Sequence, residues 1–159
     1  MNLERFLPAK SNFGGKRTVE FPVTKTISTH HALIYVMVTI AAVEGHLGDR
    51  ELKAIGRIVK QLPIFRSFDA DKLTHVAQEC GEILQDKEGL EAVFGLAAEA
   101  LTPKLRETAY ALAVEVAASD LAVGKEELRF LAMLRDHLGL DKLVTAALER
   151  GAIARYQTE

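Results

Sequence analysis

The chain has 159 residues, of which 48% are hydrophobic and 26% are charged, a composition typical of one globular domain. A net charge of -2 argues against a nucleic-acid partner, because proteins that bind nucleic acids usually carry a basic face. No basic stripe stands out. The single cysteine excludes an intrachain disulfide. We expect a cytoplasmic protein without direct membrane insertion, because we find neither a signal peptide nor an apolar run long enough to span a bilayer.

Residues 1–28 differ from the rest of the chain in charge and form a first segment, a basic N-terminal arm. A short strand from Arg17 to Val23 is conceivable, but no partner strand follows downstream, so we expect a partly ordered arm. Two roles stay open. The arm is a loose terminus, or it docks on an acidic partner or on the acidic face of its own domain.

Residues 29–159 predict helices nearly everywhere and form the second segment, a helical domain. Residues 32–43 are apolar on all sides, which favours a central helix that its neighbours bury. Residues 49–62 carry one apolar stripe, and residues 73–84 carry another that places Cys80 in the core.

The second half of the domain predicts four further helices. Asp86 is expected to cap the fourth, and Thr102 is expected to cap the fifth, which begins at Pro103 and is again apolar on nearly every side. The sixth runs from Lys125 to about His137. The expected inner face of the sixth helix consists of Leu128, Leu131, Leu134 and Leu138. Asp141 is expected to cap the seventh helix, whose expected inner face consists of Val144, Ala147 and Leu148. The predicted fold is therefore all-α, a single domain of about seven helices.

One stretch of sequence occurs twice. "TIAAVEGHLGDREL" begins at Thr39 and the similar "EVAASDLAVGKEEL" begins at Glu115, a shift of 76 residues. Each copy predicts a buried helix, a tight acidic turn and an amphipathic helix, followed by another amphipathic helix; the fourth helix is extra. Because one such unit cannot cover its own apolar face, we expect two repeats packed around central buried helices and related by a pseudo-twofold axis.

The acidic turns have two explanations. In the first, Gly48 and Gly124 are helix N-caps, and Glu51 and Glu127 lie three residues later, where a carboxylate reaches back to the backbone N–H of the cap. In the second, the turns also bind a metal ion, through carboxylates that remain open to solvent. The metal-ligating candidates are Glu44 and Glu51 in the first turn and Asp120 and Glu127 in the second.

The oxygen ligands of these turns favour a hard divalent cation, Ca²⁺ or Mg²⁺, over zinc or copper, which prefer nitrogen or sulfur. Neither turn has the alternating acidic spacing of the EF-hand calcium loop. A site made this way is short of protein ligands, so a bound ion would keep several waters or share the oxygens of a partner.

The two strings "AAVEGHLGDREL" and "AASDLAVGKEEL" resemble the signature of the TerB-like tellurite-resistance family, and the resemblance covers roughly residues 29 to 150. It implies a seven-helix fold, a divalent-ion site at the acidic turns, and a role in bacterial stress response or tellurite resistance through membrane-associated protein complexes. The chain departs from the family pattern at two positions. Glu44 stands where the family usually has aspartate, and Leu121 replaces the glycine expected after Asp120.

Other polar residues have simpler explanations than catalysis. The adjacent His30 and His31 precede the first helix and point to different sides, which favours a solvated or capping role over a metal site. Asp71, His75 and Glu79 share a helix face at four-residue steps, which would suit a metal or a proton relay, but a solvated polar face explains them. We therefore predict no catalytic residue.

Two hypotheses about function follow. The first is a non-enzymatic binding module whose acidic turns recruit a protein partner, with a homodimer left open. The alternative is a metal-assisted hydrolase that acts on a phosphorylated substrate and holds two ions between carboxylates. The hydrolase requires a basic residue such as Arg50 or Lys125 in the same cleft, and turns no more than about 10 Å apart, because paired metals lie only about 4 Å from each other.

Overall fold

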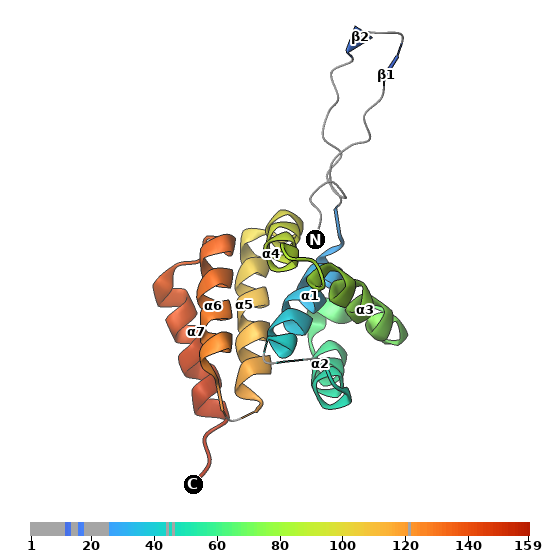
Figure 1. Ribbon diagram of the computed structural model, residues 1–159. Helices are drawn as coiled ribbons and strands as arrows, with labels where there is room; N and C mark the ends of the chain where they lie inside the picture. Colours follow the sequence, from blue (N-terminus) through green and yellow to red (C-terminus); the bar gives the residue numbers. More distant parts are fainter. Residues whose placement is uncertain (1–11, 14–15, 18–25, 44, 46, 121) are drawn as a thin grey trace.

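The structure is a computed structural model that describes residues 12–13, 16–17, 26–43, 45, 47–120 and 122–159. Within these residues seven α-helices form one helical body (Figure 1). This confirms the all-α prediction. The helices are α1 Thr29–Ala42, α2 Asp49–Gln61, α3 Leu73–Leu84, α4 Gly89–Ala100, α5 Pro103–Ala118, α6 Lys125–Leu138 and α7 Lys142–Arg155, and two short 3₁₀ helices, η2 Pro63–Phe65 and η3 Ala70–Lys72, lie between α2 and α3.

A two-residue antiparallel strand pair precedes the helices. Strand β1, Asn12–Phe13, pairs with β2, Lys16–Arg17. The sequence carries a Gly-Gly pair between them, a strong hairpin signal. Strand β2 shares only Arg17 with the conceivable strand Arg17 to Val23, whose other residues lie outside the described part of the chain. Most of the predicted arm at residues 1–28 lies outside the described residues, and its role stays a prediction.

Helices α1 and α5 form the centre of the molecule. Every residue from Ala32 to Ile40 is buried, so α1 has no solvent face along most of its length. Helix α5 is buried in the same way from Ala109 to Ala118, apart from Ala111 and Glu115. The two helices pack against each other along the middle of the body (Figure 1). The predicted burial of both helices is confirmed.

The remaining helices surround this central pair in matching positions. Helices α2 and α3 pack on α1, and α6 and α7 pack on α5. These contacts correspond to the repeat read from the sequence. Helix α4 has no counterpart and contacts α1, α3 and α6, so it ties the two halves together. Arg106 strengthens this junction by donating hydrogen bonds to backbone oxygens of Ala98 near the end of α4 and of Leu138 at the end of α6.

The inward face of α6 differs from the prediction. Leu128 is 57% exposed, whereas its neighbour Glu127 is only 5% exposed. The buried residues of the helix are Glu127, Phe130, Leu131, Leu134 and Leu138. A stripe that begins at Glu127 and one that begins at Leu128 both fit the three-four spacing of a helix, so periodicity alone could not decide between these two residues. The prediction placed Leu128 inward because it is the more hydrophobic residue, and this was wrong.

The inward face of α7 was also predicted incompletely. Its buried residues are Thr145 and Ala152, Val144 and Leu148 are half-buried, and Ala147 is exposed. Polar contacts to α5 supplement this small apolar face. The Arg155 guanidinium donates to both carboxylate oxygens of Glu115, at 2.6 and 2.7 Å, and the Tyr156 hydroxyl donates to the same carboxylate at 2.7 Å. A bidentate arginine contact of this kind fixes orientation as well as distance.

Helix starts were predicted with mixed success. Asp141 caps α7 as expected, because its carboxylate accepts from the backbone N–H of Leu143 at 2.7 Å. Pro103 begins α5, but the Thr102 side chain forms no capping hydrogen bond. Helix α4 begins at Gly89, and its N-cap position is occupied by Glu88 and not by the predicted Asp86.

Gly89 allows α3 and α4 to meet closely. A Cβ atom placed on this residue would overlap the backbone oxygen of Ile83 and lie 2.8 Å from the Cα of Leu84. Both are backbone atoms at the end of α3, so neither can rotate away. Gly95, in the same helix, has open space around its Cβ position.

We therefore expect Gly89→Ala to lower the free energy of unfolding by about 3 kcal/mol, through overpacking that only a backbone shift can relieve. The control Gly95→Ala should raise it by up to about 1 kcal/mol, because alanine is the better helix former. Urea denaturation followed by circular dichroism measures both. Equal stability of the two variants would contradict the close approach.

Candidate functional site between the two acidic turns

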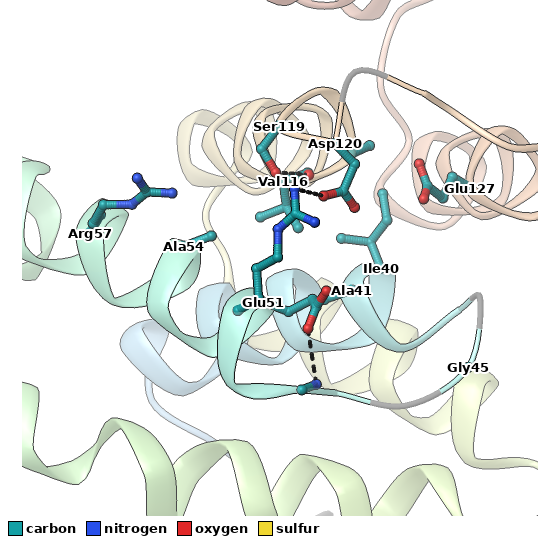
Figure 2. Close-up of a pocket in the computed structure, with 13 residues that line it drawn as sticks. Ile40, Ala41, Gly45, Glu51, Ala54, Arg57, Val116, Ser119, Asp120 and Glu127 are labelled. Carbon is teal, nitrogen blue, oxygen red and sulfur yellow. Dashed lines mark hydrogen bonds and ion pairs between the residues drawn. The ribbon is translucent and has the colours of Figure 1, made fainter.

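A cavity of about 310 Å³ lies where α1, α2, α5 and α6 meet (Figure 2). It brings the acidic turns of the two repeats to one place, because α1 and α5 end beside each other and α2 and α6 begin there. The lining residues are Ile40, Ala41, Gly45, Gly48, Arg50, Glu51, Ala54, Arg57, Val116, Ala117, Ser119, Asp120 and Glu127.

Three of the four predicted ligands line this cavity. Glu51 is half-buried, Asp120 is exposed and Glu127 is buried. The burial of Glu127 corrects the expectation that all the turn carboxylates face open solvent, because α6 directs this side chain toward the cavity and not outward (Figure 2). Glu44 lies outside the described residues.

Glu51 has the capping role predicted for the first turn. Its carboxylate accepts a hydrogen bond of 3.1 Å from the backbone N–H of Gly48, the N-cap of α2 (Figure 2). The contact satisfies one of the donors that a helix start leaves unpaired, and it places negative charge at the positive end of the helix dipole. It also uses only one of the two carboxylate oxygens.

Asp120 connects the two halves through charge. Its carboxylate lies 3.6 Å from the guanidinium of Arg50, on α2 of the other repeat (Figure 2). The two side chains are 45% and 82% exposed, so this ion pair is weakly held and contributes little to stability. Sequence reasoning named Arg50 as one basic residue of the turns, whereas Lys125, the other, does not line the cavity.

Arg57 is a second cation of the cavity that the sequence reasoning missed. It lies seven residues after Arg50, which is two helical turns along the same side of α2. This seven-residue spacing in the sequence could have indicated that Arg57 lies on the same side of the helix as Arg50.

The described carboxylates do not form a compact metal cage. Among the residues that the structure describes, no group of three or more histidine, cysteine, aspartate or glutamate side chains is close enough to hold one ion. The oxygen donors present still suit Ca²⁺ or Mg²⁺ best, and the set of Glu44, Glu51, Asp120 and Glu127 stays a prediction.

The other candidates from the sequence lie away from this cavity. Burial raises the pKa of the Cys80 thiol to about 12, so the thiol stays protonated and packs in the core. His75 lies 3.2 Å and His31 lies 3.8 Å from the carboxylate of Glu79, which also accepts from the Tyr35 hydroxyl at 3.4 Å. Two residues of the predicted polar face, His75 and Glu79, thus belong to a small network that reaches α1, whereas Asp71 lies in η3.

The prediction that the two histidines precede the first helix was wrong, because the helix begins about one turn earlier than expected. His30 and His31 lie inside the first turn of α1, after the N-cap Ser28. The ring of His30 contacts Phe65 and Phe68 and hydrogen bonds to the backbone oxygen of Ile64 at 2.8 Å. His30 therefore anchors the segment after α2 and is not a solvated residue.

The fold and the cavity define a class: an all-α domain of two repeats that holds acidic and basic side chains in one hollow between them. No helix in the described part of the chain is long and apolar enough to cross a membrane. A family model described as "Tellurite resistance protein TerB" matches residues 30–149, and the chain belongs to this family. No curated protein and no solved structure matches the chain.

Gly48 allows the close approach of the Glu51 carboxylate. A Cβ atom on Gly48 would lie 2.8 Å from Oε2 of Glu51, so the carboxylate would have to swing away and lose its hydrogen bond. We expect Gly48→Ala to lower the free energy of unfolding by about 1 kcal/mol.

A double-mutant cycle with Glu51→Ala isolates this effect. Without the carboxylate, Gly48→Ala should cost clearly less, because the clash and the lost hydrogen bond both require Glu51. The lower N-cap preference of alanine than of glycine is present with and without Glu51, so the cycle removes that contribution. Additive effects in the cycle would show that the two residues are uncoupled.

Proposed function

We propose that the protein is a non-enzymatic binding module whose acidic turns bind a divalent cation, Ca²⁺ or Mg²⁺, and recruit protein partners in a bacterial stress response. The observation that carries this proposal is the cavity that collects Glu51, Asp120 and Glu127 from both repeats. The partners include membrane-associated complexes, which the TerB resemblance implied, and the protein acts in the cytoplasm.

The ligand set supports weak cation binding that a partner can complete. Carboxylate oxygens are the ligands that hard cations prefer, and the dissociation constants of the weakest calcium sites, which depend on ligand charge and rigidity, are about 0.1–1 mM. An ion with vacant or water-filled positions accepts oxygens from a second protein. The cation would then join the two proteins instead of serving catalysis.

Arg50 opposes a cation in this cavity. Its guanidinium already lies beside Asp120, so an incoming ion competes with it for the same carboxylate. Because Arg50 is 82% exposed, it can swing into solvent at little cost, and the competition is moderate.

A metal-assisted hydrolase remains the second candidate. One observation favours it: Arg50 and Arg57 line the same cavity as the carboxylates, which is the combination that a phosphorylated substrate requires. Hydrolysis of a generic phosphoester in the presence of Mg²⁺, abolished in Asp120→Asn, would support the hydrolase over the binding module.

Calorimetric titration with Ca²⁺ and with Mg²⁺ tests the cation site. We expect a dissociation constant of about 0.1–1 mM for the wild-type protein, and at least a fivefold weakening, about 1 kcal/mol, in Glu51→Gln and Asp120→Asn, since each change removes a charged ligand. Glu99→Gln, an exposed residue of α4 outside the cavity, is the matched control. No heat with the wild-type protein, or equal loss in the control, would refute the cation part.

Replacement of Arg50 should have the opposite effect. We expect Arg50→Gln to strengthen cation binding about threefold to fivefold. The positive guanidinium competes with the cation for the Asp120 carboxylate, and its removal makes cation binding more favourable by up to about 1 kcal/mol. The same titration measures it, and Lys104→Gln, an exposed residue outside the cavity, controls for the change in net charge. Unchanged affinity in Arg50→Gln would place the ion away from Asp120.

A further inference from the structure

One side of α2 carries a row of cations. Arg50, Lys53, Arg57 and Lys60 follow each other at steps of three and four residues, so they share one face of the helix. Together they line a hollow of about 880 Å³ beside η3 and the start of α3. We call this hollow the α2 groove, and its other lining residues are Asp49, Gly56, Val59, Ala70 and Leu73.

The charge of the α2 groove is strongly positive. Four cations stand against one carboxylate, Asp49. Within the described part of the chain, Lys53, Arg57 and Lys60 form no ion pair, and Arg50 has only its weak contact with Asp120. Exposed cations gathered in a hollow produce a local positive potential that draws in negative groups, although the net charge of the whole chain is -2.

The shape and the floor of the groove favour a peptide. Val59 and Leu73, both buried, give it an apolar base, and Gly56 leaves room above that base because it has no side chain. A smaller hollow shares Val59 and Lys60 with the groove and continues it past the end of α2 to Arg66 and Phe68.

The length of the groove sets the size of its occupant. The 13 residues of α2 span about 20 Å, which an extended segment of about six residues also spans. A flat membrane surface and a rigid nucleic-acid duplex would contact the rim cations but could not reach the apolar floor. A thin chain with acidic and apolar side chains contacts both.

We propose that the α2 groove docks an extended acidic segment of a protein partner, about six residues long, with carboxylates on the four cations and an apolar side chain over Gly56. This surface is separate from the carboxylates of the acidic turns and does not require a bound cation. The inference rests on the proposed function, and it specifies that the partner of the binding module carries an acidic segment and that this segment binds at the α2 groove.

Fluorescence anisotropy on the full chain tests this assignment, with a labelled octapeptide of alternating glutamate and leucine as the probe. We expect binding that weakens as salt rises, and a loss of about tenfold or more in the double variant Lys53→Glu with Lys60→Glu, since both lysines line the groove and neither lines the acidic cavity. The double variant Lys87→Glu with Lys104→Glu makes the same change in net charge at exposed sites outside the groove, and should change affinity less than about twofold.

A steric variant checks that the peptide lies in the hollow. A Cβ atom on Gly56 makes only an ordinary contact, 3.6 Å from Leu73. Gly56→Leu fills the floor, and circular dichroism verifies that this variant is folded before its binding is measured. We expect it to weaken peptide binding about fivefold without any change in charge. The octapeptide with glutamine in place of glutamate should not bind.

Several outcomes would overturn the proposal: no binding of the peptide, equal losses in the two lysine double variants, or unchanged binding in Gly56→Leu. A preference for vesicles containing phosphatidylserine or for duplex DNA, lost in Lys53→Glu with Lys60→Glu, would reassign the groove to a membrane or to nucleic acid. Calorimetry of that variant with Ca²⁺ separates the two ideas, because a failed cation site leaves peptide binding intact, and a failed groove leaves cation binding intact.

Discussion

The packing of α1 against α5 is the constraint on which the rest of the molecule depends. Both helices are buried on nearly every side, so each needs neighbours all round, and the interface between them supplies only one side. The outer helices of both repeats and α4 complete the burial. Removing apolar surface from water stabilises this arrangement in proportion to the area covered, and each half supplies apolar surface that the other half covers.

The same packing sets the position of the charges. Because α1 and α5 end side by side, the turns that follow them share one cavity, and α2 begins at its edge. Helix α2 buries few residues, Ile55 and Val59, and exposes most of the others. It therefore presents Glu51 to the cavity, Lys53 and Lys60 to the α2 groove, and Arg50 and Arg57 to both. These two arginines are therefore common to the linings of both hollows.

Much of the fold and half of the site followed from the sequence. Uniformly apolar stretches predicted the two central helices, and the duplicated motif predicted that the acidic turns would correspond. The choice between Glu127 and Leu128 failed, because adjacent residues fit the same helical period and only the rotation of α6 in its packed position decides between them. The cations of α2 were missed because a balanced net charge hides a one-sided distribution, which becomes visible only when residues such as Lys53 and Lys60 are placed on a helix.

The attachment of α7 has a consequence for where the domain ends. The family match stops at residue 149, yet Arg155 and Tyr156 hold α7 on α5 through Glu115, whose side chain is only 17% exposed. A fragment that ends at residue 149 would lack Arg155 and Tyr156, so the Glu115 carboxylate would lose both its hydrogen-bond donors. Because this carboxylate is largely buried, water could not fully replace them. The physical border of this domain thus runs about two helical turns past the border that similarity draws.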